Sequence, residues 1–272
     1  MHVTSLGFRT DLALLELGGS VVEDRDDYLV VRTPHNPTFW WGNFLLLPAP
    51  PPPDDTPQWL ATFASAFPEA RHLAFGFDGV DGTVGDLAGF AAAGLSVEAS
   101  TVMTAQDVHP PDRPNEAATC RVLSSDDDWS QQIELRIACN DSDPDDAAHR
   151  TFATAHTNTM RALMAAGHGA WFGAFVDGRL LCSMGLFSTA PGVARFQFVE
   201  THPEARRQGL ATTLVHYASM YGFDELRAHT LVMVADPEYS AIRIYRTVGF
   251  TGTQTQLQAD RAPLRPSGES AG

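Results

Sequence analysis

The stretch 198–213 constrains this chain more than any other part of its sequence. An apolar, strand-like run leads into a turn that holds Arg206, Arg207 and Gly209, and a helix with one apolar face follows at once. The first N–H groups of a helix have no partner inside the helix, and the helix dipole favours negative charge there. Gly209 lets an anion approach the backbone closely, and Ala211 keeps the neighbouring surface small. The stretch therefore predicts an anion site, which we interpret as a pyrophosphate cradle.

Length and charge limit what surrounds this site. The chain has 272 residues, enough for one large domain or two of about 130, and its hydrophobic content of 44% supports packed cores. All eighteen basic residues are arginine, the net charge is −15, and no basic run is present. Nucleic acid is therefore not expected as a partner. The acidity favours solubility or a cationic ligand.

The cysteines and the apolar runs point to a reducing compartment. Cys120, Cys139 and Cys182 are odd in number and lack metal-ligand spacing, so we expect reduced, mostly structural thiols and no metal site. The sequence shows neither a signal-type start nor an apolar stretch long enough to cross a bilayer. A cytoplasmic protein without a membrane partner is expected.

The order of elements predicts an α/β (α+β) fold with mixed central sheets flanked by helices. Strands are expected at 28–32, 39–47, 72–77, 95–103, 119–123, 170–176, 179–187, 194–201, 230–234 and 250–257. Helices are expected at 12–17, 58–67, 85–93, 125–137, 143–166, 209–221 and 239–247. The dipeptide Asp177-Gly178 predicts a tight hairpin turn between two of the strands.

The two halves repeat with an offset near 155 residues. Pro48 falls on Pro203, each closing an aromatic-rich strand, and Gly94 falls on Gly249, each opening a last strand. Such matches in a common order predict two copies of one fold. We expect a degenerate first domain (1–104), a linker (105–118), a catalytic second domain (119–260) and a flexible tail (261–272).

The copies differ at the turn that would hold the anion. Residues 49–57 of the first copy read Ala-Pro-Pro-Pro-Pro-Asp-Asp-Thr-Pro. Proline has no N–H to offer a phosphate, and two aspartates would repel one. The first copy is therefore not expected to bind this anion.

Two blocks of the second half resemble the GNAT-type N-acetyltransferases, which bind acetyl-CoA. The phosphate-loop pattern of that family matches 206–211 (Arg-Arg-Gln-Gly-Leu-Ala), and a second family block matches 241–250 (Ala-x-x-x-Tyr-x-x-x-Gly-Phe). One departure is Glu238, where the family often has asparagine. The resemblance covers 119–260 well and 1–104 as a degenerate copy, so it implies two tandem acyl-CoA N-acyltransferase-like folds.

The resemblance implies that acetyl-CoA lies on this loop as a co-substrate. The N–H groups of roughly 207–212 would hold its pyrophosphate, and the two arginine side chains would add charge-assisted contacts. Its pantetheine arm would lie between the strand ending at Thr201 and the strand 231–234. The expected cofactor-binding residues are Val199, Thr201, Arg206, Arg207, Gln208, Gly209, Leu210, Ala211, Thr212 and Tyr245.

Two residues are candidates for the proton transfers that amine acetylation requires. Tyr245 matches the family tyrosine near the CoA sulfur and would protonate the leaving thiolate; otherwise it is a core residue of its helix. Glu200 ends the strand before the loop and would take the amine proton, directly or through water; otherwise it is solvated or structural. His202 beside Pro203 is expected to be exposed or capping.

No catalytic role is expected for several other histidines and aromatic residues. His149, His156 and His168 do not make a metal site and are expected at the surface, whereas Trp171 and Phe172 are expected in the core.

The sequence thus predicts an N-acetyltransferase that moves acetyl from acetyl-CoA to a primary amine by direct attack in a ternary complex. No cysteine lies in either family block to carry the acyl group covalently. The alternative is a non-catalytic acyl-CoA sensor or partner-binding pseudoenzyme. The acceptor stays open between a peptide and a small molecule (the two-half layout is similar to that of mycothiol synthase), and so does the oligomeric state, including a homodimer.

Overall fold

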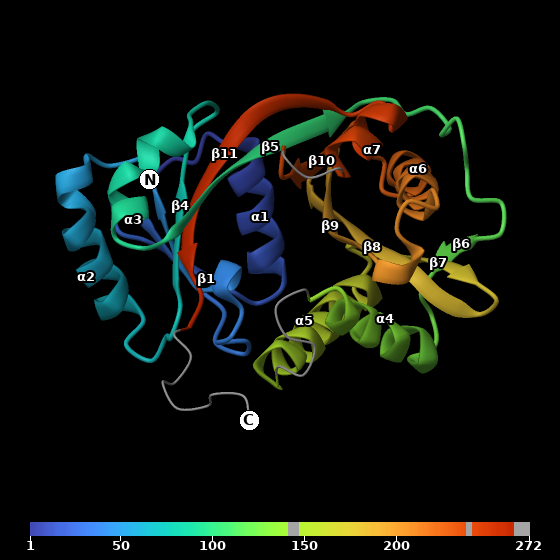
Figure 1. The fold of residues 1–272 in the computed structure, drawn as a ribbon, viewed down its shortest axis with the longest axis horizontal. Coiled ribbons are helices and arrows are strands. Elements are labelled where there is room, and N and C mark those ends of the chain that lie inside the picture. The colour runs from blue at the N-terminus through green and yellow to red at the C-terminus, as the bar shows by residue number, and fades with distance from the viewer. Residues whose placement is uncertain (141–146, 238–240, 264–272) are drawn as a thin grey trace.

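The computed structural model describes residues 1–140, 147–237 and 241–263, in which one mixed sheet of eleven strands is flanked by helices (Figure 1). The first half contains α1 Leu6–Leu17, β1 Val21–Asp24, β2 Leu29–Arg32, β3 Phe44–Leu47, α2 Thr56–Ala66, β4 Leu73–Phe77, α3 Ala88–Ala92 and β5 Ser96–Ala105. The second half contains β6 Thr119–Val122, α4 Asp126–Ala138, α5 Ala147–Ala165, β7 Gly169–Val176, β8 Arg179–Ala190, β9 Val193–Thr201, α6 Leu210–Asp224, β10 Thr230–Ala235, α7 Ala241–Val248 and β11 Thr251–Arg261. Short 3-10 helices lie at η1 Trp40–Gly42, η2 Pro53–Asp55, η3 Val84–Leu87 and η4 Pro203–Ala205.

Most expected elements are present, with local differences. The strand expected over 39–47 begins only at Phe44, because η1 occupies its start, and β1 was not expected. The predicted hairpin turn is confirmed: Asp177 and Gly178 both have positive φ, 51° and 80°. The expected helix starts at Asp143 and Tyr239, and Glu238, lie outside the described residues, as does 264–272 of the expected tail.

The last strands of the two halves are exchanged. The strand order is β1-β2-β3-β4-β11-β5-β10-β9-β8-β7-β6. β5 of the first half pairs antiparallel with β10 of the second, and β11 of the second half lies between β4 and β5 of the first (Figure 1). The α/β fold with its repeated order of elements is confirmed, and the exchange joins the two expected sheets into one.

Two parallel strand pairs at corresponding positions differ in how far they stay together. β9 and β10 pair only over Val193–Arg195 and Thr230–Val232, and β9 then continues to Thr201 without β10 beside it. In the first half, β3 and β4 stay paired to the end of β3, from Leu45 to Leu47. With the offset of 155, these three leucines correspond to 200–202, where the second half is open. The sheet therefore splays in the second half and is closed in the first.

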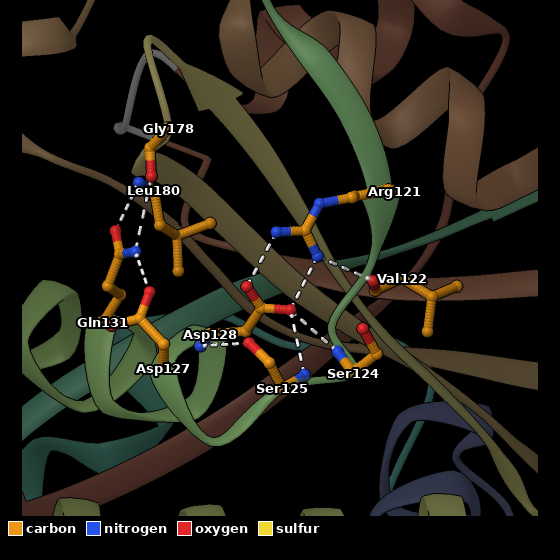
Figure 2. A network of polar contacts seen from close by, with 9 residues as sticks. All are labelled: Arg121, Val122, Ser124, Ser125, Asp127, Asp128, Gln131, Gly178 and Leu180. Atoms are coloured by element: carbon orange, nitrogen blue, oxygen red, sulfur yellow. Dashed lines mark hydrogen bonds and ion pairs between the residues drawn. The ribbon is translucent and has the colours of Figure 1, made fainter.

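Helix α4 is fixed to the sheet through its first turns (Figure 2). Ser125 and Asp128 form a capping box, and Arg121 of β6 donates two hydrogen bonds to the Asp128 carboxylate at 2.6 and 2.7 Å. The side-chain oxygen of Gln131 accepts from the N–H of Leu180 at 2.8 Å, which joins α4 to β8. These contacts set the position of the later turns of α4, which reach the site described below.

Within 1–140, 147–237 and 241–263, none of the helices combines the length and the apolar composition that a membrane span requires.

Candidate active site

The turn between β9 and α6 has the geometry of an anion-binding loop. Arg207 and Gly209 both have left-handed backbones, with φ of 64° and 79°, and flank Gln208. Alternation of this kind turns successive N–H groups to one side, a concave arrangement that favours anions. In the described part of the chain, no hydrogen bond uses the N–H groups of 207–212, and the first bond of the helix runs from Thr213 to the Gly209 carbonyl at 3.0 Å.

A cavity of about 610 Å³ adjoins this loop. Its lining residues are Cys139, Val199, Glu200, Thr201, Ala205, Arg206, Arg207, Gly209, Leu210, Ala211, Thr212, Ile244 and Tyr245. The structure therefore brings together all the sequence-predicted site residues except Gln208. The Gln208 carbonyl instead accepts a hydrogen bond from Asn115, outside the cavity lining.

The end of β9 reaches this cavity through a bulge. Phe198 has a φ of 45°, and two residues of β9, Phe198 and Val199, lie opposite Met184 alone. A bulge bends the strand and redirects the side chains after it. The Thr201 carbonyl accepts from the Cys139 thiol and from Arg206 Nε, each at 3.4 Å.

Tyr245 reaches the cavity from helix α7. The side chain comes from α7, is 4% exposed, and packs edge-on against Phe250 with ring centroids 6.5 Å apart. The side chain belongs to the hydrophobic core of the second half, and the neighbouring Ile244 also lines the cavity. The tyrosine is thus both a core residue and a cavity residue.

Glu200 lies on the α4 and α5 side of the sheet in an ion pair with Arg136. Arg136 Nε lies 3.0 Å from Glu200 Oε1, and Arg136 Nη1 lies 2.8 Å from Nδ1 of His156. The guanidinium also stacks on Phe198, 4.0 Å from the ring centroid. Burial raises the pKa of Glu200, while the Arg136 charge acts in the opposite direction. The carboxylate is therefore held in one orientation at the cavity wall.

The expectation that His156 lies at the surface was wrong. The residue is 5% exposed, between Phe198, Phe152 and Trp171. Burial and the neighbouring Arg136 charge lower its pKa well below the usual value, so the neutral ring accepts from Arg136. No sequence signal connects residues 136, 156 and 200, because they come from α4, α5 and β9.

Two further positions matter for the candidate chemistry. Cys139, interpreted as a structural thiol, lines the cavity, because the last turn of α4 ends beside Thr201. His202 caps η4, accepting from the N–H of Glu204 at 3.4 Å, as expected. No group of histidine, cysteine and acidic residues suited to a metal ion occurs in 1–140, 147–237 and 241–263.

The second half of the chain matches a known protein family. A model of the acetyltransferase (GNAT) family matches residues 131–250, a segment that contains the anion loop, Glu200 and Tyr245. Residues 131–250 therefore form a GNAT acetyltransferase segment. The match supports an acyltransferase function for the second half, and the matched segment ends at Phe250, the last residue of the second family block.

Solved structures with the same fold cover nearly the whole chain. A GCN5-related N-acetyltransferase from Kribbella flavida is 19% identical, with a TM-score of 0.63 over 97% of this chain and 98% of that one. A conserved protein of unknown function from Staphylococcus epidermidis is 12% identical, with a TM-score of 0.66 over 90% and 94%. A tandem GNAT protein from the clavulanic acid biosynthesis pathway is 14% identical, with a TM-score of 0.53 over 91% and 87%. The comparison with curated proteins finds no matching sequence. At these identities the structures establish the fold of both halves, including the first, which the GNAT family model does not match.

Proposed function

We propose that this GNAT protein transfers acetyl from acetyl-CoA to a primary amine of a small molecule or peptide, and that the second half carries the site. The observation behind this proposal is the single cavity that joins the anion loop, Glu200 and Tyr245. Neither a nucleic acid nor a membrane is part of the proposed reaction.

The residues present fit acetyl-CoA in two respects. The N–H groups of 207–212 have no partner in the described chain and suit a pyrophosphate, with Arg206 and Arg207 beside them. Beyond Arg195, the edge of β9 that faces β10 has no strand partner, which leaves room for a pantetheine arm. When bound, acetyl-CoA supplies an acetyl group activated as a thioester.

Glu200 and Tyr245 would divide the proton transfers of a direct attack. Glu200 accepts the amine proton, directly or through a water, as the nitrogen–carbon bond forms. Tyr245 donates its phenolic proton to the sulfur as the carbon–sulfur bond breaks. The Arg136 ion pair orients Glu200 for the first transfer, and its positive charge acts against the rise in the pKa of Glu200 that burial causes.

The same ion pair supports the second candidate function, a non-catalytic acyl-CoA sensor. A carboxylate that already contacts Arg136 through Nε and Nη2 has part of its hydrogen-bonding capacity occupied. The two functions differ in turnover and not in acyl-CoA binding.

The decisive experiment measures CoA release from acetyl-CoA across a panel of primary amines. Acetyl transfer predicts amine-dependent release, which Gly209→Glu abolishes by placing a carboxylate in the loop. Tyr245→Phe should lower kcat by about 10²- to 10⁴-fold, as expected for loss of a general acid, with little change in acetyl-CoA binding. Tight binding of acetyl-CoA without turnover on any amine would favour the non-catalytic acyl-CoA sensor. Undiminished activity of Gly209→Glu would refute the proposed pyrophosphate site.

A further inference from the structure

The segment that connects the two halves, residues 106–118, lies against both family blocks. It runs from the end of β5 around α7 and α6 to β6 (Figure 1). A Cβ added to Gly249 would lie 3.0 Å from the Asp107 carbonyl oxygen, and one added to Gly209 would lie 3.1 Å from that of Arg113. Both glycines therefore have this segment as their nearest neighbour.

Asn115 makes the most specific contacts of this segment. Its side-chain Nδ2 donates to the Gln208 carbonyl at 2.8 Å, and its Oδ1 accepts from the N–H of Ala117 at 3.1 Å. Its backbone N–H donates to Thr213 Oγ1 at 2.8 Å, and that hydroxyl donates to the Gly209 carbonyl at 2.9 Å. The two side-chain contacts together fix which end of the amide is the donor.

These contacts matter because of the way an anion loop is built. The N–H groups can converge on an anion only if the carbonyls between them point elsewhere, since a carbonyl oxygen would repel a phosphate. Gln208 lies between the two left-handed residues Arg207 and Gly209, so its carbonyl is the one that a reversed peptide plane would turn inward. Asn115 holds that oxygen on the outer side.

We propose that Asn115 is a positioning residue of the phosphate loop, through which the segment joining the halves sets the affinity for the pyrophosphate of CoA. This inference rests on the proposed function, because it takes the loop as the CoA site. Asn115 acts by fixing the orientation of the 208–209 peptide group.

The test uses the full-length chain and CoA in calorimetric titrations. Asn115→Ala should weaken CoA binding about tenfold, the effect of losing about one hydrogen bond that holds the loop. Asn115→Asp should weaken it further, about 30-fold, because a carboxylate repels both the Gln208 carbonyl and the nearby phosphates. Asn158→Ala, the same change at an exposed position on α5, should bind CoA like the wild type.

A spectroscopic readout separates positioning from general loosening of the fold. In ³¹P NMR spectra of saturated complexes, the pyrophosphate resonances of Asn115→Ala should shift from their wild-type positions, and those of Asn158→Ala should not. Wild-type affinity in both Asn115 variants, or unchanged pyrophosphate resonances, would overturn the role of Asn115 but not the proposed CoA site. Failure of the wild type to bind CoA would instead overturn the proposed cradle, and the inference with it.

Discussion

Arg136 and Glu200 form an ion pair almost entirely withdrawn from solvent, with Nε 3.0 Å from Oε1 and side-chain exposures of 1% and 14%. The pair places a carboxylate at the cavity wall, and Phe198 and His156 surround the guanidinium on two further sides. Removing one partner of a buried ion pair leaves the other charge buried and uncompensated, which costs much more stability than breaking a surface pair.

Replacing Arg136 by Met should therefore destabilise the fold in a pH-dependent way. Without the guanidinium, burial leaves the pKa of Glu200 further above its unfolded value. Stability is then greatest below the unfolded pKa and falls as pH rises through the folded pKa. We expect a loss of about 3–5 kcal/mol at pH 8 and a smaller loss at pH 5, measured by urea unfolding. Arg150→Met, which breaks the exposed Arg150–Glu134 pair, is the control and should cost less than about 1 kcal/mol at either pH. Equal losses for Arg136→Met at the two pH values would contradict the prediction.

Gly209→Ala should weaken CoA binding through the backbone. The residue has a φ of 79°, and a methyl group there would crowd the Arg113 carbonyl, so the loop must shift. Gly178→Ala is a matched control, because its φ is 80° and no atom lies within 4 Å of the added carbon. Both variants should lose about 1 kcal/mol of stability, from the left-handed backbone. Only Gly209→Ala should change the Kd for CoA, by about tenfold or more in titration calorimetry. Equal affinities of the two variants would contradict this.

CoA should bind with a stoichiometry of one per chain. In the first half, β3 and β4 stay paired through Leu47, and the corresponding turn contains the prolines 50–53, which have no N–H groups. The first half therefore lacks both the opening between the parallel strands and the anion loop. Calorimetry or equilibrium dialysis gives the number directly, and a value of two would contradict this explanation.

Asp260→Asn should raise the melting temperature at pH 8 and leave it nearly unchanged at pH 4. Burial and the neighbouring Glu98 raise the pKa of Asp260 to about 6, and the two side chains lie diagonally across β5 and β11. A carboxyl group with a raised pKa favours the folded state at low pH and loses that contribution as the pH passes through 6. Glu98→Gln should act in the same direction, because it removes the repulsion. A lower melting temperature at pH 8 for either variant would refute the assignment.

Local sequence signals predicted the parts of the site that follow one another along the chain. The loop at 206–211, the turn at Asp177 and the capping residue Ser125 each express a backbone requirement within a few residues, and the structure shows a left-handed Gly209, the tight turn and the cap. The partner of Glu200 was not predictable, because Arg136 reaches it through the packing of three elements far apart in sequence. The exchange of β5 and β11 was hidden for a different reason. The two strands occupy equivalent places in two similar copies, so their patterns fit either half equally well.

That exchange has a consequence for synthesis on the ribosome. The first half emerges with β4 and β5 made, but the strand that lies between them, β11, consists of residues 251–261 and is made after the whole of the first half. No early-folding intermediate can complete the first half of the sheet. The edges of β4 and β5 that face β11 therefore lack this partner until residues 251–261 have been made, and unpaired strand edges of this kind favour aggregation.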